Sequence, residues 1–223
     1  MSTSSGYGQQ QPNDASTDLT GIAAIVSAMI AEMSTMALVQ VSAVTGGGVA
    51  PAGTVTVTPL VSQIDGNGYP TPHGPVPNIP WSRVQGGQNA IICDPVVGDI
   101  GYVVTSDRDI SKVKNTMAAA SPGSRRRNDI ADGVYAGGCL NVAPNQYLIF
   151  TSSGVRLVDA NGNSLAMTST GFSLTDGNAN SLVSTSSGMT LTFSGGNKII
   201  MAAGFVNIVA PQLQVNGVPV VVP

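Results

Sequence analysis

The sequence predicts a mainly β protein with an N-terminal helix, a small Greek-key barrel and a C-terminal β-prism of three intertwined chains. Apolar residues alternate with a period of two between about residues 35 and 145. From residue 146 onward, a unit of 17 residues repeats. Charged residues make up only 9% of the chain, against about 25% in ordinary soluble domains. We therefore expect much of the surface to be buried against copies of the same chain.

We expect no targeting signal in the N-terminal region. Residues 1–18 are polar and contain no Lys or Arg, whereas a secretory signal begins with basic residues. The apolar run Leu19–Ala31 is shorter than the roughly 20 residues that cross a bilayer. We expect residues 1–17, which are rich in Ser, Gln, Gly and Asn, to be disordered or to become ordered only on docking.

A helix is predicted to begin after Asp18, which is a good N-cap residue. Apolar residues then recur at heptad spacing, as Leu19, Ile22, Val26, Met29, Met33 and Met36. Glu32 is the only charge beside this stripe, so the helix is expected to be buried against sister helices, a neighbouring protein or its own domain. Because the strand pattern starts near Thr35, the stripe is expected to overrun the helix. Residues 1–34 are thus predicted to form a disordered tail and a helix that faces a partner.

Residues 35–145 are predicted to form the barrel. Leu38–Val44, Thr54–Ile64, Ala90–Cys93, Gly101–Thr105 and Gly133–Asn141 have the pattern of strands. The prolines of Asp65–Pro80 exclude a central strand there, and Ser121–Asp129 is a polar loop. Five strands with uneven loops suit a small Greek-key barrel.

Residues 146–223 are predicted to form the prism. Three units begin Gly154-Val155-Arg156-Leu157, Gly171-Phe172-Ser173-Leu174 and Gly188-Met189-Thr190-Leu191, and a weaker fourth begins Gly204-Phe205-Val206-Asn207. Each unit fits two strands and two short turns. One chain has too few large residues to build a core, so three chains wound about a shared axis are expected. Their Val, Leu, Phe and Met side chains would point inward, and Ser and Thr outward.

Residues 79–109 resemble the N-terminal OB-like domain of phage baseplate spike proteins, the baseplate assembly protein V type that includes the membrane-piercing spikes. The resemblance rests on Ile79-Pro80-Trp81, on the turn Pro95-Val96-Val97-Gly98-Asp99-Ile100-Gly101 and on Ser106-Asp107-Arg108-Asp109. The C-terminal repeats and Val215-Asn216-Gly217 are similar to the trimeric β-helical needle of that family. The likeness extends over most of residues 35–223.

The resemblance implies a structural role in the virion, at the tail baseplate, after assembly in the host cytoplasm. The partners it implies are two further copies of the chain, the tail hub and, transiently, the host outer membrane. On sheath contraction such a spike is pushed through the envelope before genome ejection. No enzymatic activity, cofactor or specific nucleic acid is expected.

Some members of this family bind an apical iron through a His-x-His pair. This chain has no histidine after His73 and ends Val218-Pro219-Val220-Val221-Val222-Pro223, so we predict no metal site. The apolar tail closes the tip, or a separate tip protein caps it. Cys93 and Cys139 are more typical of two buried free thiols than of a disulfide.

Other polar residues have structural interpretations. Asp99, Asp107 and Asp109 suit turns, caps and local pairing with Arg108 better than metal or acid–base chemistry. Trp81 is expected to be a packing anchor. Arg125-Arg126-Arg127 is a solvated loop, a contact with an acidic hub surface or, least favoured, a nucleic-acid contact.

Two other function classes stay open from the sequence. A trimeric tail fibre adhesin or an OB-type binding module would need a receptor or ligand site. A tail hydrolase would need a placed pair of carboxylates, and Asp159 and Asp176, one repeat apart, fit outward turns better. We predict no catalytic residue.

Overall fold

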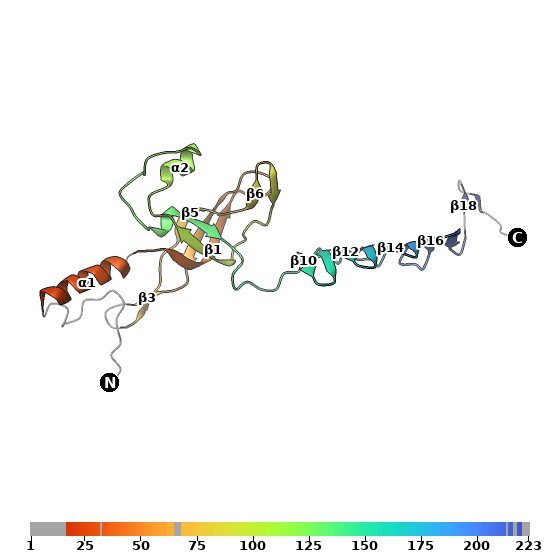
Figure 1. Ribbon diagram of the computed structural model, residues 1–223, viewed down its shortest axis with the longest axis horizontal. Coiled ribbons are helices and arrows are strands. Elements are labelled where there is room, and N and C mark those ends of the chain that lie inside the picture. Colours follow the sequence, from red (N-terminus) through yellow and green to blue (C-terminus); the bar gives the residue numbers. More distant parts are fainter. Residues whose placement is uncertain (1–16, 32, 65–67, 213, 216–217, 220–223) are drawn as a thin grey trace, which may run out of the picture. The chain divides into compact units, whose positions relative to one another are not determined.

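The computed structural model describes residues 17–31, 33–64, 68–212, 214–215 and 218–219. The protein is mainly β and divides into two compact units, Met1–Asn141 and Val142–Pro223 (Figure 1). Residues 1–16, for which the sequence predicts disorder or ordering on docking, lie outside the described part. Among the described residues, no helix is long and apolar enough to cross a membrane.

The N-terminal helix α1 runs from Asp18 to Ala31. Its cap is Thr17 rather than the predicted Asp18, which is the first residue inside the helix. The Thr20 amide donates to Thr17 Oγ1 at 3.2 Å, and the Thr17 amide donates to Thr20 Oγ1 at 3.0 Å. This reciprocal pair satisfies two backbone donors at the helix start. Asp18 still favours the helix, because a carboxylate in the first turn interacts well with the helix dipole.

The apolar stripe overruns α1, as expected, because Met33 follows the helix and Met36 begins the first strand. The side chains of Leu19, Ile22 and Met29 are exposed, and no α1 residue with a described side chain is buried. The interpretation that the helix packs on its own domain is therefore wrong for this chain by itself. The helix leaves its stripe available to another molecule.

A curled five-stranded antiparallel sheet forms the body of the first unit, and its order is β5-β2-β1-β8-β9. The strands are β1 (Met36–Thr45), β2 (Thr54–Pro59), β5 (Val76–Pro80), β8 (Ile100–Thr105) and β9 (Gly133–Ala136). Just beyond β5, Trp81 makes a parallel bridge to Tyr135 of β9, and the Ser82 amide donates to the Tyr135 carbonyl at 2.9 Å. The two edges of the sheet thus approach each other, which gives a half-barrel.

The core lies on the concave side of this sheet. Alternate positions of the strands point inward because side chains alternate along a strand. The buried residues are Val39, Val41, Val55, Val57, Ile79, Trp81, Val103 and Tyr135, so Trp81 is the expected packing anchor. Gly101 leaves room for the Tyr135 ring, since a Cβ there would lie 2.7 Å from the ring and 2.6 Å from the Ala136 carbonyl oxygen.

Several predicted strands of this unit need correction. The predicted strand Thr54–Ile64 ends at Pro59, and β3 (Gln63–Ile64) pairs with β4 (Pro70–Thr71) in a separate hairpin. The proline-rich loop contains β5, which is an edge strand, where missing amide donors are tolerated.

The predicted strand Ala90–Cys93 is not part of the five-stranded sheet. Residues Asn89–Ile91 form β7, which pairs with β6 (Val84–Gly86) in a hairpin of its own. Strand β9 ends at Ala136, earlier than the predicted Asn141. The structure also contains two short helices that were not predicted, the α-helix α2 (Ser111–Thr116) and the 3-10 helix η1 (Ile130–Asp132). The loop at Ser121–Asp129 is confirmed.

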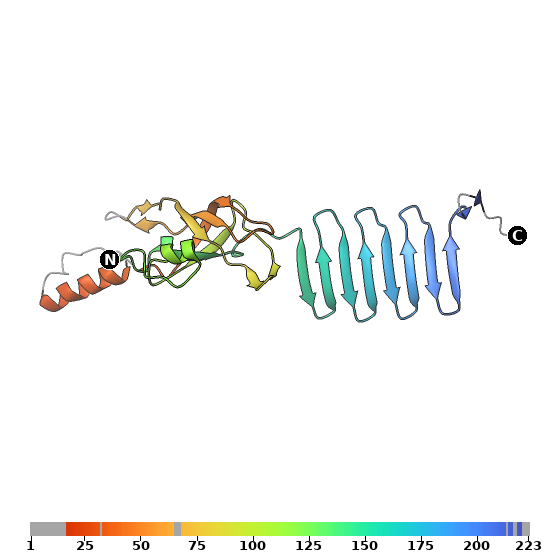
Figure 2. The ribbon, with the colours of Figure 1, turned by 90° about the horizontal axis from the view of Figure 1, so that it is seen from above.

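The second unit is an eight-stranded antiparallel meander in which every strand pairs with the next along the chain (Figure 2). The strands are β10 (Tyr147–Thr151), β11 (Gly154–Val158), β12 (Ser164–Thr168), β13 (Gly171–Thr175), β14 (Ser181–Thr185), β15 (Gly188–Thr192), β16 (Lys198–Ala202) and β17 (Phe205–Val209). A small separate hairpin follows, β18 (Gln214–Val215) with β19 (Val218–Pro219).

Candidate functional site

The meander repeats with a constant register. Gly154 faces Thr168, Gly171 faces Thr185, and Gly188 faces Ala202. Each residue therefore lies in one straight row with the residue 17 positions later, two strands further on. The predicted repeat of two strands and two turns is confirmed, with strands of five residues.

One face of this sheet is almost entirely apolar. The pairing brings one aliphatic residue from each of the eight strands into a continuous row. This row contains Leu148, Leu157, Leu165, Leu174, Leu182, Leu191, Ile199 and Ile208. The second row on the same face contains Phe150, Val155, Met167, Phe172, Ser184, Met189, Met201 and Val206. We call the two rows together the apolar face; Ser184 is its one polar member.

Nothing in the described chain covers the apolar face. No residue of the second unit with a described side chain is buried, and Phe150 is 75% exposed and Leu157 51%. Burying one such side chain stabilises a structure by about 1.5–3 kcal/mol. Sixteen side chains in two straight rows therefore make a patch of the kind that marks an interaction surface.

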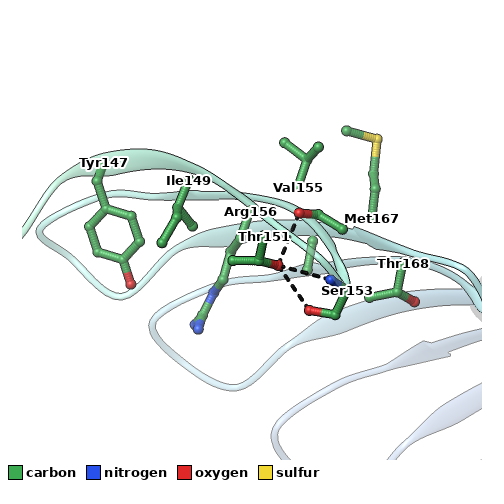
Figure 3. Close-up of a pocket in the computed structure, with 10 residues that line it drawn as sticks. Tyr147, Ile149, Thr151, Ser153, Val155, Arg156, Met167 and Thr168 are labelled. Atoms are coloured by element: carbon green, nitrogen blue, oxygen red, sulfur yellow. Dashed lines mark hydrogen bonds between the residues drawn. The ribbon is translucent and has the colours of Figure 1, made fainter.

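The opposite face is mixed and carries a shallow hollow of about 370 Å³ beside β10. Tyr147, Ile149 and Arg156 project on this side, whereas Val155 and Met167 project on the other (Figure 3). The hollow is lined by one cation and no carboxylate. It therefore lacks the pair of acidic groups that glycoside hydrolysis needs.

Hydrogen bonds fix the turns along one rim of the sheet. Asp159 accepts from the Asn161 amide at 2.9 Å, the Asn163 amide at 2.9 Å and Asn163 Nδ2 at 2.6 Å. Asp176 repeats this arrangement with Asn178 and Asn180. These bonds, above all the one from the asparagine side chain, lower the pKa of both carboxyl groups. Asp159 and Asp176 thus have the turn role that the sequence favoured.

The turns on this rim are also linked to one another. Asn163 Oδ1 accepts from the Gly177 amide at 3.1 Å, and Asn180 Oδ1 accepts from the Ser194 amide at 2.9 Å. The equivalent donor one repeat later would be the amide of residue 211. That residue is Pro211, which has no amide hydrogen. The linkage therefore stops where the sheet stops.

On the other rim, a glycine begins each of the first three repeat units, and its contacts explain why. A Cβ on Gly171 would collide with the Ser184 carbonyl oxygen of the next strand, and Gly154 and Gly188 are constrained in the same way. One repeat later the equivalent residue is Phe205, not the predicted Gly204. Among the described strands, none follows β17 in this sheet, so a side chain is allowed there. Ile208, rather than Asn207, occupies the leucine position of the fourth repeat.

The first unit separates the three aspartates that the sequence grouped together. Asp99 holds its own turn, accepting from the Val96 amide at 2.8 Å. Asp109 accepts from the Ser111 amide at 2.8 Å at the start of α2. Its charged partner is Arg126, at 3.4 Å, and not the expected Arg108.

Arg126 is also the main partner of the buried Asp132, donating to its two carboxylate oxygens at 3.1 and 3.0 Å. A third carboxylate, Asp129, lies 3.8 Å away. All three arginines are exposed, as a solvated loop requires, but Arg126 also pairs with buried carboxylates, whereas a solvated loop implies no such partner. Only the fold reveals this cluster, because residues 109 and 126 are far apart in the sequence.

A second ion pair, which the sequence did not indicate, holds the β1–β2 loop. Arg83 Nη2 lies 2.7 Å from Asp94 Oδ1, Arg83 Nη1 donates to the Ala50 carbonyl at 2.7 Å, and the Gly48 amide donates to Asp94 Oδ2 at 2.6 Å. The Gly48 amide and then Arg83 lower the pKa of Asp94.

Both cysteines are free thiols. Cys93 is exposed, and Cys139 is half-buried. The expectation of two buried thiols is therefore wrong. Among the described residues, no group of three His, Cys, Asp or Glu side chains could hold a metal ion.

The apolar face is therefore the strongest candidate site, and its geometry suits assembly. Comparisons with known proteins add no relative: no protein-family model matches the chain, and no curated protein sequence matches it significantly.

Proposed function

We propose that this protein is the structural central spike of a contractile phage-type tail baseplate. In this proposal it is a homotrimer whose first unit, closed as an OB-like barrel, docks to the tail hub. The eight-stranded sheet forms one side of a three-sided β-prism that pierces the host outer envelope during injection. The observation that carries the proposal is the uncovered apolar face.

The dimensions and register of the sheet favour burial against copies of itself. Eight strands at about 4.8 Å spacing and five residues each make a face of about 34 by 17 Å. Because the rows are straight, an identical face matches it along its whole length. The apolar face supplies two side chains per strand, which is enough for a narrow hydrophobic core between the chains. The resemblance of residues 79–109 and of the repeats to baseplate spikes favours three copies over two.

The hub contact is assigned to α1. No residue from Leu19 to Ala31 carries a charge, and the apolar side chains of this helix are exposed. A helix that is apolar on most of its surface is stable when it is buried in a larger assembly. In this proposal the tip is closed by the apolar C-terminal residues or by a separate tip protein, and the spike contacts the host outer membrane transiently. The proposed action involves no covalent chemistry.

The first experiment is the mass of the purified full-length protein by light scattering, before and after SDS without boiling. We expect a species of three chains that survives the detergent. Leu174→Lys places a charge on the apolar face and should abolish the trimer. Ser173→Lys, its neighbour on the opposite face, is the matched control and should leave the trimer intact.

A wild-type monomer would overturn the proposal and favour an OB-type binding module. Equal loss of the trimer in both lysine variants would show that the apolar face is not the interface. A stable trimer that binds a cell-surface receptor but never crosses a membrane would favour the tail fibre adhesin.

A further inference from the structure

We propose that residues 108–127 form a docking surface for a protein partner with an acidic surface and an apolar pocket. These residues include α2 and most of the loop after it, which lie to one side of the curled sheet (Figure 1). We call them the α2 lobe. The Lys112 ammonium donates to Ser121 Oγ at 3.3 Å, and the Gly123 amide donates to the Asp109 carbonyl at 3.4 Å. The helix and loop are thus held together as one body.

Positive charge is concentrated in the α2 lobe. Six of the nine Lys and Arg residues of the chain lie there: Arg108, Lys112, Lys114, Arg125, Arg126 and Arg127. Arg108, Lys112, Arg125 and Arg127 are exposed. The rest of the chain carries most of the acidic residues, so the lobe is a basic region on a protein of net charge −3.

In the described part of the chain, Arg126 is the one cation of the lobe that pairs with carboxylates. It pairs with Asp109 and Asp132, which are both buried. Its two sequence neighbours, Arg125 and Arg127, take part in no side-chain hydrogen bond or ion pair within the described residues. Arg126 therefore anchors the loop, and Arg125 and Arg127 are left free for a partner.

Met117 adds an apolar anchor to the lobe. It is 86% exposed and ends α2 in the left-handed conformation, with φ of 50° and ψ of 29°. Gly or Asn usually occupies that position, because a side chain with a Cβ is strained there. Val113 and the alanines at 118–120 are also exposed around it.

The composition of the lobe favours a protein over a nucleic acid. Met and Arg are enriched in the cores of protein interfaces. Proteins that bind single strands stack bases on aromatic side chains, and residues 108–127 contain none. The complementary partner has carboxylates for Arg125 and Arg127 and a pocket for Met117. The inference concerns the first unit and does not depend on the proposed trimer.

The test uses the full-length chain and three labelled probes in a fluorescence anisotropy titration: poly-glutamate, a glutamate–tyrosine copolymer and single-stranded DNA. We expect the copolymer to bind several-fold more tightly than poly-glutamate, and DNA to bind more weakly than either. Arg125→Ser with Arg127→Ser should weaken copolymer binding by about tenfold, because both cations are exposed and unpaired. Arg156→Ser with Lys198→Ser changes the net charge equally and should leave binding unchanged.

Met117→Gly separates a docking role from a purely structural one. It relieves the left-handed strain, so the thermal midpoint should rise, while the preference for the copolymer over poly-glutamate should disappear. Tighter binding of DNA, equal losses in the two charge variants, or an unchanged copolymer preference in Met117→Gly would each overturn the proposal.

Discussion

Arg126 shows how one residue decides the role of its neighbours. Its guanidinium lies against Asp132, Asp109 and Asp129 and so fixes the loop to η1 and to the start of α2. The buried Asp109 carboxylate also accepts hydrogen bonds from Ser111 and Ser124, which, ahead of Arg126, hold its pKa well below the usual range.

This lowered pKa predicts how acid affects the first unit. In the unfolded chain an Asp carboxyl group has a pKa of about 3.9. In the folded protein the pKa of Asp109 lies below that value. The stability contributed by Asp109 is thus present above pH 4 and is lost as pH falls through the folded pKa. We expect Asp109→Asn to lower the thermal midpoint at pH 7 but to lose less stability on acidification than the wild type. Thermal melts followed by circular dichroism at pH 7 and pH 3 test this; parallel losses in both proteins would contradict it.

At the scale of elements, the strands of the meander are interchangeable except where the row pattern breaks. Ser184 takes the position that Met167 and Met201 occupy one repeat away, and it pairs with Phe172 and Met189. Phe172 takes the position that the smaller Val155 and Met189 occupy one repeat away. A small residue directly opposite a large one is the arrangement that a closed core favours.

We therefore expect Ser184→Met to destabilise the assembled protein by about 1–3 kcal/mol, the usual cost of overpacking. In a sheet whose face stays in water, the same change adds an apolar cross-strand contact and is neutral or stabilising. Phe172→Met combined with Ser184→Met should recover part of the loss. Thermal unfolding of the purified oligomer measures all three. A neutral Ser184→Met in a stable trimer would show that the two positions are not matched in volume.

At the scale of the whole molecule, the constant register makes sheet length modular. Deleting residues 171–187 removes β13 and β14 and joins Thr170 to Gly188, which reproduces the original junction of Thr170 with Gly171. Asn163 would then face the Ser194 amide in place of that of Gly177. The shortened sheet keeps both rows of the apolar face.

We expect this 17-residue deletion to keep the oligomeric mass and to shorten the sheet by about 10 Å, two strand spacings. Deleting residues 171–186 instead shifts every later strand by one residue and turns its apolar side chains to the other face. That control should not assemble. Light scattering and electron microscopy distinguish the two. Equal assembly of both deletions would mean that the register does not define the interface.

The sequence by itself determined the features that depend on local periodicity. The 17-residue spacing, the alternation of apolar and polar residues and the Asn/Gly turns specify the strands of the meander, because each hairpin pairs residues close in sequence. The alternation likewise placed β1 and β8. Patterns of this kind can be recognised in the sequence without knowing which strand is the pairing partner.

Only the tertiary structure decided features that join distant residues. Strand β5, the separate β6–β7 hairpin and the Trp81–Tyr135 bridge depend on long-range pairing. The cluster around Arg126 was hidden because three adjacent arginines look alike in sequence, while the fold buries the partners of only one. The start of the fourth unit was misplaced at Gly204 because a glycine is required only where a following strand approaches. That contact exists at Gly188 and not at Phe205.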